Sequence, residues 1–254
     1  KATTIPDVVS DVVPGFSHEY INYMLGGSFR ASLRPLNDAI MSGRIRGVVA
    51  NVGCNNPRVQ QDGAHNSVVA QLLANDVLVV ETGCGALASA KCGLLLGEAA
   101  MEWAGPGLRE VCEAVGIPPV LHMGSCVDNT RILTVLRQMA TEGGLGEDIS
   151  DIPAVALAPE WMSEKAMAIA SYAAASGAYV IMGVHNPVDG SDVVTRILGE
   201  VWEEKVGGKI EFVVEPDEIV ARSLAHIDKK RAALGLPAYD PTKWGKSGDQ
   251  RMEA

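Results

Sequence analysis

The sequence of 254 residues predicts an α/β fold built on an open, mainly parallel β-sheet. From about residue 45 onward, short Val-rich runs alternate with longer stretches of helical periodicity. The runs show little polar alternation, as expected of strands that are buried on both faces. Glycine is abundant, with 27 residues, while aromatic residues make up only 5%, which favours close packing of helices on a sheet over an aromatic-rich sandwich.

The elements are predicted in chain order. Residues 1–44 are expected to form a helical leader without a strand of its own. Strands are expected at 47–52, 77–81, 119–123, 154–158, 178–182 and 210–214. Helices are expected at 67–75, 85–100, 107–115, 129–142, 161–176, 191–205 and 217–234. This alternation gives right-handed βαβ units. We therefore predict a Rossmann-like, doubly wound domain over 45–234, followed by an irregular tail at 235–254.

Composition and charge exclude several classes of protein. The chain has 21 basic and 31 acidic residues and a net charge of −10, which argues against nucleic-acid binding because phosphates need a basic face. No apolar run approaches the roughly 18 residues of a membrane span, and the first residues show no secretory leader. We expect a cytoplasmic protein. Because the chain begins with Lys1 rather than Met, we also expect it to be a piece of a longer protein.

Five cysteines are present, at positions 54, 84, 92, 112 and 126. Their odd number, in a chain without a secretory signal, does not suggest a disulfide framework. No CxxC pair occurs, so a zinc ribbon or thioredoxin motif is excluded. A metal site would therefore need cysteines that are distant in sequence and are brought together by the fold.

Three of the cysteines occupy equivalent places in the predicted fold. Cys54 follows the first strand in NVGCNN, Cys84 follows the second in ETGCGA, and Cys126 follows the third in HMGSCVDN. Ligands of open α/β sheets bind at the carboxyl ends of the strands, so we expect these thiols to converge on one crevice. Nearby helix N-termini would lower their pKa values and favour the thiolates that soft metals bind.

The alternative for any single cysteine is a small buried apolar residue. Repetition in three equivalent turns favours a shared metal or cluster site instead. Cys92 and Cys112 fall within predicted helices, where we expect them to lie in the core. A competing motif, Gly83-x-Gly85-x-x-Ala88, matches a dinucleotide fingerprint, but the acidic residue expected about 20 positions later does not end a second strand. Nucleotide binding is therefore kept as a lower-ranked alternative.

One lysine and two histidines are further candidates. Lys165 is expected in the first turn of the helix after the fourth strand, where a cation is disfavoured by the helix dipole. It is either a solvated surface residue or a point charge that holds an anionic substrate. His65 and His185 are expected in loops at the same edge and could relay protons, whereas His122 is expected within a strand.

Four ordered motifs then show a resemblance to a known family. NVGCNN, TGCG, VLHMGSCVDNTR and APEWMSEKAMAIA closely resemble the C-terminal domain of anaerobic nickel–iron carbon monoxide dehydrogenase, of the prismane/hybrid-cluster superfamily. GSCVDN and PEWMSEKA are the most specific pieces. The resemblance implies reversible oxidation of carbon monoxide with water to carbon dioxide, two protons and two electrons at a nickel–iron–sulfur cluster.

The resemblance also implies residue roles. Cys54 and Cys84 match cysteines that bind irons of the cluster, and Cys126 matches the cysteine that binds nickel. Lys165 matches a lysine that hydrogen-bonds bound carbon dioxide or hydroxide, and Ile169 matches an apolar residue beside the substrate. One His and two Cys ligands, and the 4Fe-4S relay clusters, belong to upstream parts in that family. We therefore expect this chain to be inactive by itself.

The partners that the resemblance implies are a second copy in a homodimer and a ferredoxin-like electron acceptor. An acetyl-CoA synthase subunit is a further possible partner, because the sequence resembles the acetogen form. The alternatives that stay open are a hybrid-cluster protein acting on hydroxylamine, a nucleotide-binding or thiol-dependent Rossmann enzyme without a cluster, and a structural α/β domain.

Overall fold

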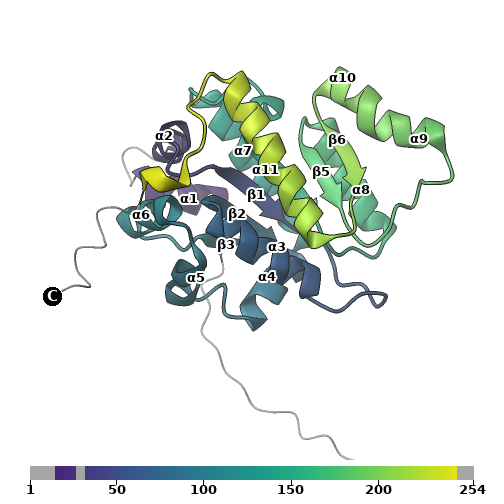
Figure 1. Ribbon diagram of the computed structural model, residues 1–254, viewed down its shortest axis with the longest axis horizontal. Helices are drawn as coiled ribbons and strands as arrows, with labels where there is room; N and C mark the ends of the chain where they lie inside the picture. Colours follow the sequence, from purple (N-terminus) through teal and green to yellow (C-terminus); the bar gives the residue numbers. More distant parts are fainter. Residues whose placement is uncertain (1–14, 27–31, 245–254) are drawn as a thin grey trace, which may run out of the picture.

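The computed structural model describes residues 15–26 and 32–244 of the chain. In this part, the strands form one all-parallel sheet in the order β3-β2-β1-β4-β5-β6 (Figure 1). Their bounds are β1 Gly47–Asn51, β2 Val77–Thr82, β3 Val120–Gly124, β4 Ala154–Ala158, β5 Tyr179–Met182 and β6 Lys209–Phe212. The prediction of an α/β, Rossmann-like, doubly wound sheet is confirmed.

The sheet forms because its central strands are apolar on both faces. Every residue of β1, β2 and β5 is buried, as their Val-rich sequences predict. The chain proceeds outward from β1 to β3 and then crosses to the other side of β1 to continue with β4. The boundary between β1 and β4 is therefore the topological switch point, where ligands of such sheets bind.

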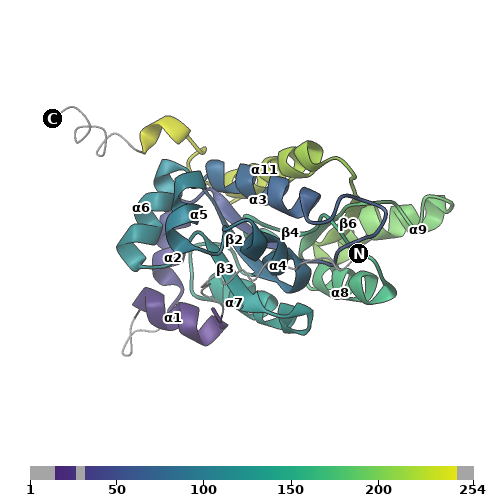
Figure 2. The same cartoon turned by 90° about the horizontal axis from the view of Figure 1, so that it is seen from below.

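Helices cover both faces of the sheet. Figure 2 shows α3 and α11 on one face and α7 and α8 on the other. The bounds are α1 His18–Gly26, α2 Arg34–Ser42, α3 Gly63–Ala74, α4 Gly83–Lys91, α5 Gly97–Trp103, α6 Pro106–Val115, α7 Asn129–Thr141, α8 Glu164–Ala175, α9 Asp192–Arg196, α10 Trp202–Val206 and α11 Pro216–Ala233.

Three predicted helices differ from the structure. The helix expected at 85–100 is two helices, because Gly93 adopts a left-handed φ of +84° that ends α4. The helix expected at 191–205 is interrupted by a π-helical turn, η3 (Ile197–Val201). The helix expected at 67–75 begins earlier, at Gly63, in a turn without the apolar spacing used for the prediction.

The leader and the tail pack on one end of the sheet. Leu33 and Ile40 are fully buried in the main core, and the carbonyl of His122 in β3 accepts hydrogen bonds from the backbone of Gly15 and Phe16. The buried Arg231 guanidinium donates to the carbonyls of Ile40 (2.7 Å), Arg46 (3.1 Å) and Pro237 (3.0 Å). It thereby joins α2, the start of β1 and the tail.

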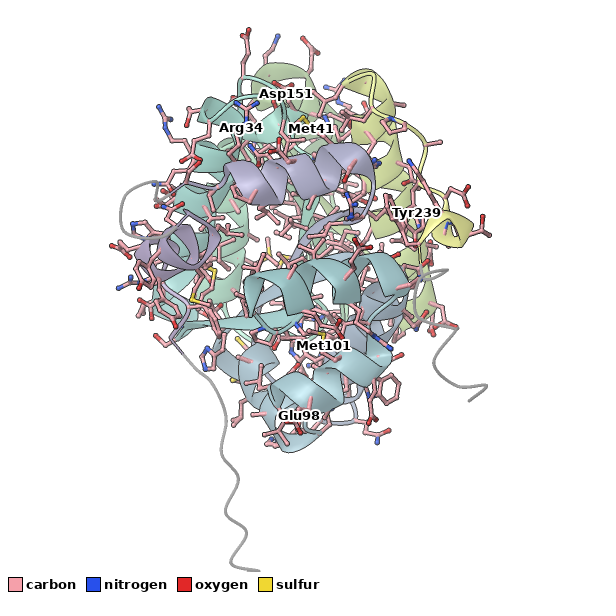
Figure 3. The ribbon with its side chains drawn as sticks, turned by 90° about the vertical axis from the view of Figure 1, so that its left-hand side faces the viewer. Arg34, Met41, Glu98, Met101, Asp151 and Tyr239 are labelled. Carbon is pink, nitrogen blue, oxygen red and sulfur yellow. The ribbon has the colours of Figure 1, made fainter. Side chains whose placement is uncertain are left out.

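Figure 3 shows this end of the molecule, with Arg34 and Met41 on α2, Glu98 and Met101 on α5, and Tyr239 of the tail to one side. The parts of the predicted leader and tail at 1–14, 27–31 and 245–254 lie outside the described residues. None of the described helices is both long enough and apolar enough to cross a bilayer.

Candidate metal centre at the carboxyl edge of the sheet

The three candidate cysteines follow three neighbouring strands. Cys54 lies shortly after β1, Cys84 is the second residue of α4 directly after β2, and Cys126 opens the short 3-10 turn η1 (Cys126–Asp128) after β3. Because β3, β2 and β1 are adjacent and parallel, the three turns share one edge of the sheet. All three thiols are free and partly exposed.

The loop that carries Cys54 is docked on the loop after β4. The Cys54 amide donates to the carbonyl of Glu160 at 2.9 Å. Gly53 has a φ of +122°, and a Cβ there would lie only 2.4 Å from the same carbonyl, so this approach requires glycine. The two sides of the switch point are therefore joined next to the thiol.

The expectation that a helix N-terminus lowers the pKa of Cys54 is wrong. Burial raises the pKa of this thiol and outweighs the backbone hydrogen bond from Met162, which lowers it. Residues 55–62 separate Cys54 from α3, so the N-terminus of the helix that follows it in sequence does not come directly after this thiol. A bound cation would have to supply the stabilisation that its thiolate needs.

The turns of Cys84 and Cys126 approach each other closely. Gly83 has a φ of +61°, and a Cβ at this position would lie 3.2 Å from the Cβ of Cys126. On the other side, the Asp128 carboxylate accepts hydrogen bonds from the backbone (2.8 Å) and the hydroxyl (3.1 Å) of Ser125. This capping box fixes the turn that presents Cys126.

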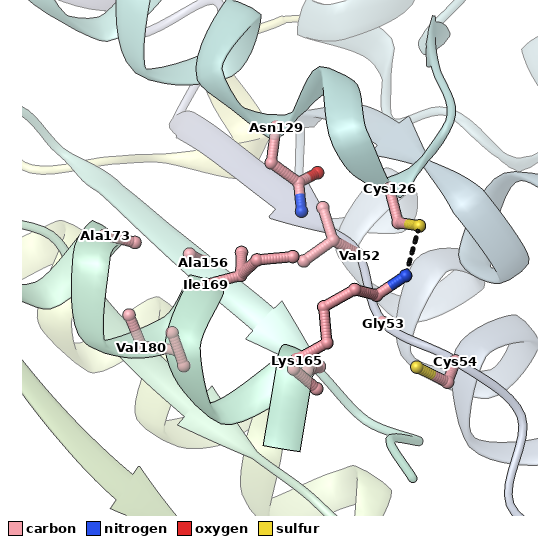
Figure 4. Close-up of a pocket in the computed structure, with 13 residues that line it drawn as sticks. Val52, Gly53, Cys54, Cys126, Asn129, Ala156, Lys165, Ile169, Ala173 and Val180 are labelled. Atoms are coloured by element: carbon pink, nitrogen blue, oxygen red, sulfur yellow. Dashed lines mark hydrogen bonds between the residues drawn. The ribbon is translucent and has the colours of Figure 1, made fainter. Parts of the chain in front are cut away.

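Lys165 faces the thiol of Cys126. Its Nζ donates to the Cys126 Sγ at 2.9 Å, although the side chain is exposed to solvent (Figure 4). This hydrogen bond, the charge of Cys126 and the more distant Cys54 and Cys84 raise the pKa of Lys165, so it stays a cation. Lys165 is therefore exposed and at the same time directed at the Cys126 thiol, and its role toward an anionic substrate stays a prediction.

A pocket opens beside this contact. Its lining borders about 450 Å³ of space, part of it open to solvent, at the carboxyl ends of β1 and β4, and Figure 4 shows Cys54, Cys126, Lys165, Ile169 and Asn129 around it. The rest of its lining is aliphatic or glycine: Val52, Gly53, Ala156, Ala158, Ala166, Ala170, Ala173 and Val180. A second pocket of about 410 Å³ shares part of this lining and extends between α7 and α8.

The remaining candidates lie elsewhere. Cys112 is buried in α6, as expected, and burial raises its pKa to about 12. Cys92 is exposed rather than in the core, because α4 ends just before it. His65 lies in α3 and is fully buried, not in a loop. His185 does lie in a loop, after β5, with its ring stacked 4.7 Å from Trp161.

Sequence reasoning missed the buried polar residues behind the site. Asn51, Glu81 and Glu160 are fully buried at the carboxyl ends of β1, β2 and β4. A single polar residue closing an otherwise apolar strand, as in GVVAN and VLVVET, is the signal that could have identified the first two. Such residues need hydrogen-bond partners in the fold.

The donor set has the chemistry of a soft-metal site. Thiolates bind iron–sulfur clusters and soft transition metals, and three free thiols on neighbouring turns, with an apolar pocket and a cation beside them, supply this environment. Within the described residues, no three His, Cys, Asp or Glu side chains are placed to hold a single ion by themselves.

The fold and the site define the class of protein: a doubly wound α/β domain with thiols at the edge of its switch point. Comparison with known proteins assigns the family. The chain belongs to the Prismane/CO dehydrogenase family, whose model matches residues 4–218.

Individual relatives agree with this assignment. The chain is 50% identical over 238 residues to carbon monoxide dehydrogenase 1 of Methanosarcina mazei, which covers 93% of this chain and 36% of the relative. It superposes on carbon monoxide dehydrogenase IV of Carboxydothermus hydrogenoformans with a TM-score of 0.84 at 46% identity, covering 89% of this chain and 37% of that one. The chain thus spans about a third of the length of the curated relatives that it matches.

A second similar structure is an acetyl-CoA synthase/carbon monoxide dehydrogenase whose alpha subunits hold NiZn[Fe4S4] and NiNi[Fe4S4] clusters. It has a TM-score of 0.84 and 37% identity, and the match covers 88% of this chain and 34% of that one. Its identity is lower than that of the two proteins above, so identity does not favour the acetogen form.

Proposed function

We propose that this chain is part of a carbon monoxide dehydrogenase, and that it supplies one half of a nickel–iron–sulfur site that interconverts carbon monoxide and water with carbon dioxide, two protons and two electrons. The family assignment supports this proposal. The observation that carries it is the 2.9 Å contact between Lys165 and Cys126 at the mouth of an apolar pocket. Since the relatives are longer, we assign the complete activity to a longer protein.

Three residues would hold the cluster. Cys54 and Cys84 would bind iron, and Cys126 would bind nickel, because thiolates suit both metals. When bound, the cluster would supply the redox chemistry and the binding site for carbon monoxide. We propose that its remaining ligands, and the 4Fe-4S relay clusters, come from a segment outside this chain, so that this chain alone is inactive.

Lys165 would stabilise negative charge on the reacting oxygen. Conversion of neutral carbon monoxide to carbon dioxide places charge on oxygen during the reaction, and an ammonium already fixed beside Cys126 can donate a hydrogen bond to that oxygen. A preorganised donor of this kind typically contributes about 2.7–4 kcal/mol to the transition state. The raised pKa of Lys165 keeps its proton in place at neutral pH.

The aliphatic side of the pocket would admit a small neutral gas and restrict water. Ile169 lies one helical turn after Lys165 and lines the pocket with Val52 and Ala156. This apolar lining offers a bound water few hydrogen bonds, and a low local dielectric strengthens the effect of the lysine charge. Ile169 therefore shapes the substrate side of the site.

Metal analysis of the intact protein separates this proposal from its alternatives. Nickel together with iron and viologen-linked carbon monoxide oxidation would support it. Iron without nickel would favour a hybrid-cluster protein acting on hydroxylamine, and absence of both metals would favour a Rossmann enzyme without a cluster. The fingerprint glycine Gly85 gives nucleotide binding little support, since a Cβ there would lie 2.9 Å from the Asn51 carbonyl, so tight packing explains it.

The partners are further proposals. The similar acetyl-CoA synthase/carbon monoxide dehydrogenase supports a synthase subunit as a possible partner. A homodimer, a ferredoxin-like electron acceptor and a cytoplasmic, anaerobic setting rest on the family resemblance. A size measurement of the purified intact protein would test the homodimer, and electron transfer to added ferredoxin would test the electron acceptor.

A further inference from the structure

A chain of four buried polar side chains ends at the backbone of Cys54. Ser89 Oγ donates to Glu81 Oε1 at 2.9 Å, and Asn51 Nδ2 donates to the same oxygen at 2.7 Å. His65 Nδ1 lies 3.1 Å from Asn51 Oδ1, and His65 Nε2 lies 2.9 Å from the carbonyl oxygen of Cys54. We call these four residues the buried relay. All four side chains have 0% exposure.

The buried relay joins the elements that carry two of the candidate cluster ligands. Its members come from α4 (Ser89), β2 (Glu81), β1 (Asn51) and α3 (His65). Asn51 ends β1 three positions before Cys54, and Glu81 lies three positions before Cys84, so the relay lies directly behind both turns. Within the relay, the register of the sheet sets Asn51 directly opposite Glu81.

A second, independent contact fixes α4 to the same asparagine. A Cβ at Gly85 would lie 2.9 Å from the Asn51 carbonyl oxygen and 3.3 Å from its side-chain nitrogen. The first turn of α4, which contains Cys84, therefore rests directly on Asn51. One residue thus contacts both the helix that presents Cys84 and, through His65, the carbonyl of Cys54.

Burial of four polar side chains needs a reason beyond stability. Each one is costly to bury when its hydrogen bonds are not made, and the aliphatic Val49 and Val79 fill the preceding positions on the same faces of these strands. A hydrogen-bonded chain has a benefit that an aliphatic cluster lacks, because it defines the direction and distance of each contact.

The end of the chain at Cys54 has a defined direction. A backbone carbonyl can only accept, so Nε2 of His65 carries the hydrogen and donates it to the Cys54 oxygen. Nδ1 then carries no hydrogen and can only accept, so it forms a hydrogen bond with Asn51 when the amide of Asn51 is turned with its nitrogen toward the ring and its oxygen toward a protonated Glu81, whose pKa burial raises to about 8. Outer hydrogen bonds of this type orient metal ligands in many proteins.

We propose that His65, Asn51 and Glu81 are positioning residues that hold the Cys54 carbonyl and the first turn of α4 at a fixed separation, so that the thiols of Cys54 and Cys84 are presented together to a metal cluster. The identity of that cluster rests on the proposed function above. The fixed placement of the two thiols is a property of this chain and can be measured without metal.

The test compares His65→Leu with His65→Gln in the intact protein. Leucine removes the donor to Cys54, whereas the amide nitrogen of glutamine can replace Nε2. In the metal-free form, we expect the alkylation rate of Cys54, followed by mass spectrometry, to change at least about threefold in His65→Leu and to stay near the unaltered protein in His65→Gln. In the metal-loaded form, we expect about 10- to 100-fold weaker iron retention and an altered electron paramagnetic resonance spectrum only in His65→Leu.

Ser223→Ala is the matched control, because Ser223 is also fully buried and donates only to the backbone of its own helix. It should change neither alkylation nor the spectrum. Unchanged Cys54 alkylation and an unchanged spectrum in folded His65→Leu would overturn the proposal. If His65→Leu does not fold, Glu81→Leu decides in the same way, with Glu81→Gln as its conservative partner. A protein that binds no cluster but shows the alkylation change would refute the proposed function and retain the positioning role.

Discussion

The Nζ of Lys165 lies 2.9 Å from the Sγ of Cys126, although 39 positions separate the two residues in the chain. The lysine lies in the first turn of α8 after β4, and the cysteine follows β3, which lies on the far side of β1 and β2 in the sheet. Their contact spans the mouth of the pocket at the switch point. Through this contact, Lys165 places a positive charge directly beside Cys126, the candidate metal ligand.

Removal of the Lys165 amine tests the catalytic role that we propose for it. In the intact, metal-loaded protein, Lys165→Ala should lower carbon monoxide oxidation by about two to three orders of magnitude, because a preorganised donor is lost. Metal content should stay near normal, which elemental analysis would check. Lys91→Ala is the matched control, since Lys91 is another exposed lysine near this edge and pairs with Asp62 at 2.8 Å. A Lys165→Ala rate within about threefold of normal would contradict the prediction and identify Lys165 as a solvated surface residue.

Loss of the Cys126 thiol should affect nickel first. Cys126→Ala in the intact protein should abolish carbon monoxide oxidation and deplete nickel more than iron, because a soft metal loses its protein thiolate. Elemental analysis combined with a viologen assay measures both effects. Cys92→Ala serves as the control, since Cys92 is exposed at the end of α4 and should leave metal and turnover unchanged. Normal nickel with normal turnover in Cys126→Ala would refute the assignment.

Addition of one methyl group should disturb the approach of two ligand turns. Gly83→Ala places a Cβ at a φ of +61° and 3.2 Å from the Cβ of Cys126. We expect a loss of about 1–3 kcal/mol of unfolding free energy, measured by urea denaturation, together with altered alkylation of Cys126. Gly190→Ala is the control, because no atom lies within 4 Å of its added Cβ and its φ is ordinary. Equal stability of the two variants would contradict the prediction.

Acid should destabilise the fold through the β5–β6 edge. Burial and the nearby Lys230 and Lys209 lower the pKa of His226 to about 4 from 6.5. Burial alone would raise the pKa of Glu211, but hydrogen bonds from Lys209, Tyr179 and Arg222 prevail and lower it to about 2 from 4.5.

Both depressed pKa values act in the same direction. The unfolded chain binds more protons than the folded one, so stability is lost as pH falls from 6.5 to 4 for His226 and from 4.5 to 2 for Glu211. Each contribution is at most about 3 kcal/mol. Denaturation at a series of pH values should show a flatter slope between 6.5 and 4 in His226→Gln. The same slope as in the unaltered protein would contradict the His226 prediction.

The sequence by itself determined the strands, their parallel direction and the turns that carry the cysteines. Strands buried on both faces must be continuously apolar, so GVVAN, VLVVET and AVALA stand out from the helical stretches between them. A helix after each strand allows only parallel neighbours with right-handed crossovers. The turns of Cys54, Cys84 and Cys126 must then lie at one edge, and the metal-binding role of these thiols stays a prediction.

The tertiary structure alone decided which turns meet. Local periodicity reports the buried face of a segment and carries no information on its partner across the sheet, so the order β3-β2-β1-β4-β5-β6 had to come from long-range packing. That order places Lys165 beside Cys126. It also buries His65 behind Cys54, where sequence reasoning expected a loop, because the first turn of α3 is held by contacts with Asn51 and Cys54 rather than by apolar spacing of its own.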